Sequence, residues 1–260
     1  MIILENVITL YLIRHARQSS PLCNVNVELA KEGIRQSKLL GQKLKAYNID
    51  EVYSSHLIRA VMTADIVRNE IDTTDSKRKE DNITEETKEC GVDKCDREKE
   101  REKKYQLEDL RETDFGELTG LPDSVLRVKY ADYYAARDLK REDLRIPGGE
   151  NGEEVYIRMN RAMESIIDSA VSKGYKNIAV ISHGGAIRCY LAGLLSMPQS
   201  HRFMIAKNME NTAITEIRYN IDTKVYSVEK VNDYSHLEGH DELLRKHFKE
   251  QGFHYHMESV

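Results

Sequence analysis

Two histidines stand where apolar runs of the sequence end. Residues 9–13 lead into Arg14 and His15, and residues 178–181 lead, through a serine, into His183. A neutral imidazole is nucleophilic near pH 7 and can form a covalent intermediate. Because ligands bind at the carboxyl edge of an open α/β sheet, we predict that the two histidines face each other across one pocket the size of a phosphate group.

Groups that suit an anion accompany both histidines. Arg14 can offer phosphate a planar fork of donors. Gly184 and Gly185 let backbone approach a ligand, and a helix that begins there would direct free N–H groups and its positive dipole end at an anion. Arg59 lies one turn into a predicted helix, where it can point back over the sheet edge. Taken singly, either histidine could be a structural residue of the core, and Arg59 could be an arginine in contact with solvent.

A loop over residues 107–120 supplies the carboxyl groups. Glu112 and Asp114 lie in it, and Gly116 and Gly120 close it. A carboxyl group beside a phosphate can protonate a leaving oxygen. Acidic loop residues are usually only solvated, but Glu112 stands between apolar residues and the two glycines. We therefore take Glu112 as the candidate general acid.

The elements that must position these residues alternate between strand and helix. Short β-branched apolar runs predict strands, and apolar residues that recur every three to five positions predict helices. In the first half of the chain, the predicted elements are a strand at 7–13, a helix at 29–47, a strand at 52–54 and a helix at 57–67. In the second half, a helix is predicted at 122–137, followed by a helix that has an apolar face over 155–170 and ends at Gly174. After it come a strand at 177–181, a helix at 186–195 and two closing strands at 213–219 and 224–231. This order predicts a parallel sheet covered on both faces.

A charged stretch interrupts the pattern at residues 72–104. It is dominated by acidic and basic side chains and has few apolar ones. Such a segment buries too little surface to offset its ordering entropy, so we predict an insertion in a single domain that spans residues 1–260. Residues 97–104 alternate in charge, which is compatible with a solvated helix. A plain surface excursion and a substrate lid or partner site are both open interpretations.

Composition narrows the classes of function. The chain has 260 residues, of which 40% are hydrophobic and 32% charged, and a net charge of −5. This charge disfavours wholesale attraction to nucleic acid, and no apolar run approaches the roughly 20 residues that cross a bilayer. The first residues lack the pattern of a signal peptide. Four scattered cysteines form neither a disulfide framework nor a zinc site, which favours a cytoplasmic protein.

Taken together, these residues make the sequence resemble the histidine phosphatase superfamily, also called the phosphoglycerate-mutase-like family. The resemblance covers nearly the whole chain except residues 72–104 and rests on motifs that occur in order. These are Arg14-His15-Ala16, Ser54-Ser55 through Arg59-Ala60 with Thr63-Ala64, Glu112 with Phe115-Gly116 and Gly120, Pro147-Gly148-Gly149-Glu150, Ser182-His183-Gly184-Gly185, and finally Asn208 and Asn211-Thr212-Ala213. It implies a three-layer α/β fold with a mostly parallel central sheet and helices on both faces.

The resemblance also implies a mechanism. His15 would attack phosphorus, and Arg14, Arg59 and His183 would bind the equatorial oxygens. Glu112 would protonate the leaving oxygen and then act as base toward water. The catalytic residues are thus His15, Glu112 and His183. The substrate-binding residues are Arg14, Arg59, Gln18 and Gly184, and no metal or cofactor is expected. Ala16 replaces the signature glycine, and its methyl group would matter if the pocket needs a positive φ or close backbone approach there.

Hydrolysis of a small phosphorylated metabolite is the preferred function. A phosphoglycerate-type mutase is the first alternative, but we cannot match the longer stretch that the resembling mutases carry after the first motif, and Lys103-Lys104 lies in an unrelated context. A catalytically weak phosphate-binding or interaction module is the second. The presence of Glu112 and both histidines argues against this module, because a pure binder would not need a general acid. Substrate identity stays open, as does the oligomeric state, for which a homodimer is one candidate.

Overall fold

A six-stranded sheet forms the centre of the protein. The computed structural model describes residues 6–80 and 105–246. Its strands are β1 Val7–Arg14, β2 Glu51–Ser55, β3 Gln106–Leu107, β4 Asn177–Ser182, β5 Ile214–Asn220 and β6 Tyr226–Asp233. They lie in the order β3-β2-β4-β1-β5-β6. The β3-β2, β2-β4 and β4-β1 pairs are parallel, whereas β5 pairs antiparallel with both β1 and β6.

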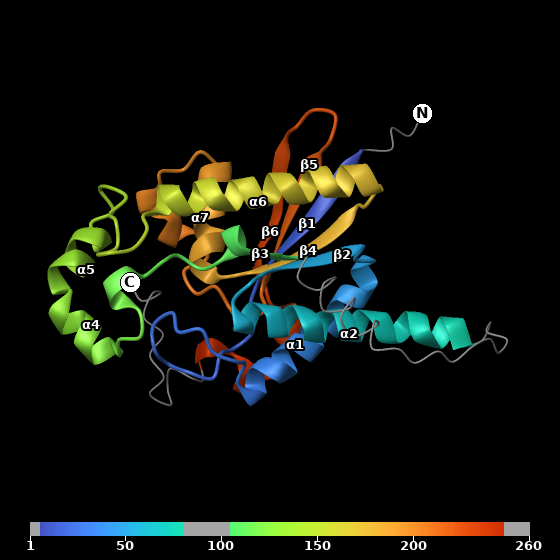
Figure 1. The fold of residues 1–260 in the computed structure, drawn as a ribbon, viewed down its shortest axis with the longest axis horizontal. Coiled ribbons are helices and arrows are strands. Elements are labelled where there is room, and N and C mark those ends of the chain that lie inside the picture. The colour runs from blue at the N-terminus through green and yellow to red at the C-terminus, as the bar shows by residue number, and fades with distance from the viewer. Residues whose placement is uncertain (1–5, 81–104, 247–260) are drawn as a thin grey trace, which may run out of the picture.

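Helices cover both faces of this sheet (Figure 1). They are α1 Lys31–Leu44, α2 Ile58–Glu80, α4 Asp123–Lys129, α5 Ala131–Asp138, α6 Gly152–Lys173 and α7 Gly184–Leu194. Short 3₁₀ turns lie at η1 Lys45–Tyr47, η2 Glu108–Leu110, η3 Gly116–Leu118, η4 Gln199–Met204, η5 Ser235–Leu237 and η6 Asp241–Leu243. The predicted three-layer, mostly parallel α/β fold is confirmed. Among the residues described, no helix is both long and apolar enough to cross a membrane.

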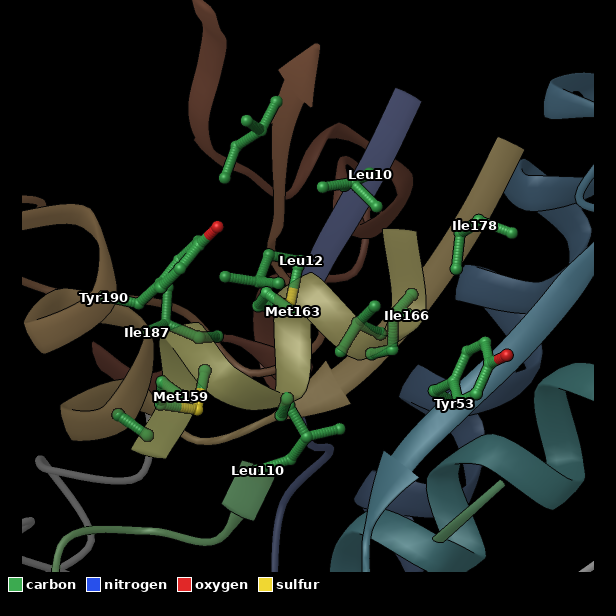
Figure 2. Close-up of a cluster of buried hydrophobic side chains, with 14 of the residues drawn as sticks. Leu10, Leu12, Tyr53, Leu110, Met159, Met163, Ile166, Ile178, Ile187 and Tyr190 are labelled. Atoms are coloured by element: carbon green, nitrogen blue, oxygen red, sulfur yellow. The ribbon is translucent and has the colours of Figure 1, made fainter. Parts of the chain in front are cut away.

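Alternation along β1 separates two layers of core. Leu10 and Leu12 point to one face, where they join buried side chains of α6 and α7 (Figure 2). Tyr11 and Ile13 point to the other face, where they meet buried residues of α1 and α2. Successive strand residues face opposite sides of a sheet, so a strand that is apolar at every position is buried on both. This burial fixes β1 in the middle of the molecule.

The long helix α6 has the local signals of a stable helix. The Asn151 side chain accepts the Glu154 backbone N–H, and the Glu154 side chain accepts the Asn151 backbone N–H, which is a complete capping box. Buried residues from Val155 to Ala170 form its inner face. Gly174 ends it with φ at 71°, as predicted from the sequence, because a left-handed residue closes a helix most cheaply as glycine.

Among the predicted element boundaries that differ from the structure, three have an identifiable cause. Helix α2 continues to Glu80 rather than ending near residue 67, because residues 68–80 contain neither glycine nor proline to stop it. The helix predicted over 122–137 is two helices that part at Tyr130, whose ring packs into a third buried cluster. Strand β6 begins at Tyr226 instead of residue 224, since Lys224 adopts φ of 62° in the preceding turn.

The predicted insertion is helical where it begins. Its first residues, 72–80, belong to α2. Residues 81–104 lie outside the described residues, and so does the predicted helix over 97–104. The single-domain assignment with an insertion therefore stays a prediction.

Candidate active site

Strand register places the two histidines side by side. Strands β1 and β4 are adjacent and parallel, and Arg14 is paired with Ser182 at their ends. His15 and His183 each follow by one residue, and the His15 N–H donates to the Ser182 carbonyl at 2.8 Å. Their ring centroids lie 4.9 Å apart with the planes tilted by 54°. Two positions 168 residues apart in sequence therefore meet because the sheet pairs their strands.

His15 is held in one tautomer. Its Nδ1 lies 2.7 Å from the Ala16 carbonyl oxygen, which can only accept, so Nδ1 carries the proton. The Arg59 Nε–H donates to His15 Nε2 at 3.3 Å, which requires a lone pair there. Burial, followed by the charges of Arg59 and Arg14, lowers the pKa of His15 well below its usual value. The imidazole is thus neutral, with Nε2 as its nucleophilic atom.

His183 is fully buried at the start of α7. Neither of its ring nitrogens has a hydrogen-bond partner within the described part of the chain. Burial, and then the nearby Arg59 and His15, lower the pKa of His183 well below its usual value. Buried polar groups are normally paired, so these nitrogens are suited to a ligand that enters beside His15.

Arg59 reaches the site from the second residue of α2. Besides its bond to His15, its guanidinium donates to the Asn24 side-chain oxygen and the Val25 carbonyl, both at 3.0 Å. The group is 2% exposed, and burial lowers the pKa of Arg59 to about 10. Arg14, at the end of β1, donates through Nη1 to the Met209 carbonyl.

Glu112 lies against the beginning of α7. Its carboxylate accepts the backbone N–H groups of Gly185 at 3.2 Å and Ala186 at 3.0 Å, as well as that of Thr113 at 2.9 Å. We expected the N–H groups at this helix start to face a bound anion, and here they hold the Glu112 carboxylate instead. A Cβ on Gly185 would come within 2.6 Å of that carboxylate, so the close approach requires glycine at this position.

Arg158 of α6 fixes the loop that carries Glu112. Its guanidinium donates to the backbone carbonyls of Asp109, Arg111 and Glu112 at 2.8, 2.7 and 3.0 Å. It also pairs with both carboxylate oxygens of Glu150 at 2.9 Å. Burial alone would raise the pKa of Glu150, but the hydrogen bonds from Arg158 and the Asp114 N–H outweigh it, so this pKa is lowered.

A cavity opens where these side chains meet. It holds about 740 Å³ of empty space, counted together with the open solvent at its mouth. The predicted residues on its wall are Arg14, His15, Gln18, Arg59, Glu112 and Gly184. His183 is not among the residues on the wall, but its ring lies 4.9 Å from that of His15. Its other lining residues are Pro21, Leu22, Cys23, Asn24, Phe115, Gly185, Arg188, Phe203, Asn211 and Arg245. All seven predicted site residues are therefore brought together, while their catalytic roles stay predictions.

A family model for the histidine phosphatase superfamily (branch 1) matches residues 10–86 and 97–233. The chain belongs to this superfamily. The match breaks at residues 87–96, inside the charged stretch that the motifs do not cover.

Relatives within the superfamily include both phosphatases and mutases. A broad-specificity phosphatase of Saccharomyces cerevisiae is 25% identical over 241 residues, which are 90% of this chain and 89% of that protein. The phosphoglycerate mutase-like protein 4 of Arabidopsis thaliana is 29% identical and covers 83% of this chain and 78% of its own. A 2,3-bisphosphoglycerate-dependent phosphoglycerate mutase of Methanococcus vannielii is 27% identical over 77% of this chain and 83% of its own.

Solved structures share the fold at lower identity. A mycobacterial glucosyl-3-phosphoglycerate phosphatase superposes with a TM-score of 0.67 at 17% identity and covers 87% of this chain and 99% of its own. A phosphoglycerate mutase of Bacillus anthracis gives a TM-score of 0.67 at 22% identity, over 90% and 96% of the two chains.

Within this superfamily the chain departs from the signature at Ala16. Its φ is not positive, so the backbone does not need glycine there. The side chain is fully buried, and its N–H donates to the Thr63 hydroxyl at 3.1 Å. The alanine is thus accommodated without backbone strain in the loop after β1, and it is not among the residues that line the cavity.

Sequence reasoning missed three polar residues that line the cavity. They are Asn24, Arg188 and Arg245. Arg188 had a detectable signal, because it is a charged residue in a helix that is otherwise apolar on nearly every side. Gln18 was included, and its amide nitrogen donates to the Ser20 and Leu22 carbonyls at 2.8 and 3.4 Å, which orders the cavity wall.

The described residues contain no group of three or more His, Cys, Asp or Glu side chains placed to hold a metal ion. Cys90 and Cys95 lie outside those residues. The two described cysteines, Cys23 and Cys189, are free thiols, and burial raises the pKa of Cys23 to about 12. Cys23 is therefore a protonated thiol on the cavity wall at neutral pH.

Proposed function

We propose that this protein hydrolyses a small phosphomonoester through a phosphohistidine formed on His15, without a metal ion. The observation that carries the proposal is the neutral His15 imidazole, whose Nε2 lone pair is fixed at a cavity lined by arginines. A neutral, oriented nucleophile beside cationic groups suits attack on the phosphorus of an anionic ester.

The reaction has two steps. In the first, His15 Nε2 forms a bond to phosphorus, the bond to the ester oxygen breaks, and Glu112 gives its proton to that oxygen. In the second, Glu112 takes a proton from a water molecule, the water oxygen bonds to phosphorus, and the P–N bond breaks to release inorganic phosphate. Arg14, Arg59 and His183 would hold the phosphoryl oxygens throughout, as fixed donors that need little reorganisation.

Detection of the intermediate tests this proposal. Wild-type protein mixed with a ³²P-labelled phosphomonoester in the absence of metal, then denatured in alkali to preserve the P–N bond, is expected to retain label. His15→Ala should retain none, and His236→Ala, which changes a partly buried histidine outside the cavity lining, should label like wild type. Label that survives in His15→Ala would overturn the assignment. Phosphoester binding without turnover across a broad substrate panel would instead indicate a binding module.

A mutase is the second candidate, because several relatives bear that name. Incubation with 3-phosphoglycerate and a 2,3-bisphosphoglycerate primer distinguishes the two. We expect release of inorganic phosphate from a phosphomonoester and no formation of 2-phosphoglycerate. Accumulation of 2-phosphoglycerate at a rate above phosphate release would assign the mutase reaction.

Three further features remain proposals. We propose a cytoplasmic location, which the free thiols of Cys23 and Cys189 support. A homodimer is proposed as the assembly, and sedimentation equilibrium would measure it. A single domain with an insertion is proposed as the organisation of the chain, and the break in the family match at residues 87–96 supports it.

A further inference from the structure

We infer that Arg245, carried by the segment after the last strand, is a further phosphate-binding residue of this site. The inference deepens the proposed function and rests on it. Arg245 lines the same cavity as Arg14 and His15, although it lies far from both in sequence. Arg245 is only 3% exposed. An arginine is rarely buried this fully unless an anion or several hydrogen-bond acceptors balance its charge.

Arg245 lies next to Arg14. The Nη1 atom of each guanidinium donates to the Met209 carbonyl oxygen, at 2.8 Å for Arg245. The shared acceptor keeps the two guanidinium groups close together at the cavity that His15 also lines. Two positive charges this close to each other favour an anion beside them. The pair is therefore suited to holding the same phosphoryl group.

The charges around the cavity support an anionic ligand. Four arginines line it, namely Arg14, Arg59, Arg188 and Arg245. Glu112 is the one acidic residue among the described residues on its wall, so cationic side chains outnumber acidic ones there. Such a wall favours an anion, and Arg245 adds to that preference.

The segment that delivers Arg245 is firmly docked. Both Glu210 carboxylate oxygens accept the Arg245 backbone N–H at 3.1 Å. The side chain of Gln36, in α1, donates to the Leu243 carbonyl at 2.8 Å and accepts the Arg17 N–H at 2.8 Å. Leu243 itself is fully buried. These contacts tie the segment both to α1 and to the loop that follows His15, so the position of Arg245 is built into the fold.

Binding of inorganic phosphate to the purified full chain, measured by isothermal titration calorimetry, tests the inference. Arg245→Met keeps the length of the side chain but removes its charge, and we expect the dissociation constant for phosphate to rise by roughly tenfold to a hundredfold, as for a lost hydrogen bond between charged groups. The matched control is Lys246→Met, which removes one positive charge from the next residue. Lys246 is exposed and pairs with Asp241, so phosphate binding should stay at the wild-type level.

Arg245→Lys keeps the charge but loses the planar fork, and its affinity should lie between those of wild type and Arg245→Met. Circular dichroism establishes which variants are folded. A folded Arg245→Met that binds phosphate as tightly as wild type overturns the inference. Should that variant fail to fold, wild-type affinity in Arg245→Lys overturns it.

Phosphate binding compared with phosphohistidine labelling separates this inference from the proposed function. Phosphate binding does not require turnover. If the wild type forms no phosphohistidine while Arg245→Met binds phosphate more weakly than the wild type, the proposed function is rejected and Arg245 stays a binding residue. A wild type and an Arg245→Met that label equally and share one kcat/KM would reject Arg245 and keep the function.

Discussion

Each catalytic histidine owes its protonation state to where it lies. The unfolded chain would protonate His15 and His183 near pH 6.5, whereas burial and the neighbouring arginines keep both neutral in the folded protein. A protonated His15 could not attack phosphorus. The arginines that bind the ligand therefore also keep the nucleophile active.

The pH dependence of His15 follows from this arrangement. Its pKa is lowered, so it should stay neutral and protonated only at Nδ1 as the pH falls from 7 to 6. Nitrogen-15 NMR of the imidazole measures this directly, and the acid limb of kcat/KM that belongs to His15 should lie below pH 6.5. Protonation of His15 at pH 6.5 would contradict the expectation. Arg59→Met, which removes a positive neighbour, should move that protonation to higher pH.

At the scale of elements, α6 acts as the support of the catalytic loop. Its Arg158 donates to the backbone carbonyls of Asp109, Arg111 and Glu112, and Glu150 balances its charge. The glycines before Glu150 let the two loops meet, since a Cβ on Gly149 would lie 2.2 Å from the Asp114 carbonyl oxygen. The position of Glu112 thus depends on a helix that contributes no residue to the cavity wall.

Loss of Arg158 should therefore destabilise the protein. Arg158→Met removes the main partner of the partly buried Glu150 carboxylate, which keeps Arg111, and it takes the side-chain donor from three backbone carbonyls. We therefore expect the free energy of unfolding to fall by about 3–5 kcal/mol. Arg161→Met is the matched control, because Arg161 pairs with Asp109 from the same helix but is 68% exposed. It should cost no more than about 1 kcal/mol. Urea denaturation measures both values, and equal losses in the two variants would refute this role of Arg158.

At the scale of the whole molecule, partial or full burial keeps three described histidines neutral. His15 and His183 are buried at the cavity. His236, partly buried in η5, lies 2.9 Å from the Thr212 hydroxyl, and burial lowers its pKa to about 4. Below pH 6.5 the unfolded chain takes up protons that the folded protein does not. The free energy of unfolding must therefore fall as the pH falls from 6.5 toward the lowered pKa values of the folded protein.

The size of this loss can be measured at His236. Between pH 6.5 and pH 5 this one group should lower the free energy of unfolding by up to about 2 kcal/mol, at roughly 1.4 kcal/mol for each pH unit. Urea denaturation of wild type and His236→Gln at the two pH values measures it. The variant lacks the titrating group and should lose correspondingly less stability. An identical pH dependence in both proteins would show that His236 does not titrate on unfolding.

The sequence indicated much of this architecture because its signals are local. An uninterrupted apolar run shows that β1 is buried on both faces, and a capping box with a terminal glycine defines α6. The boundaries that were wrong depend on contacts from elsewhere. The break at Tyr130 arises because its ring is buried against Leu118 and Ile146, which come from two other loops.

The sequence by itself determined the family and the residues around His15, His183, Arg59 and Glu112, because each lies in a motif next to a recognisable strand or helix. Only the tertiary structure decided that Glu112 rests on the start of α7 and that Arg245 enters the cavity. Arg245 lies in a polar segment without periodicity, and its burial comes from Gln36, Met209 and Glu210. Such long-range pairing leaves no local pattern, since each partner looks like an ordinary surface residue until the chain is folded.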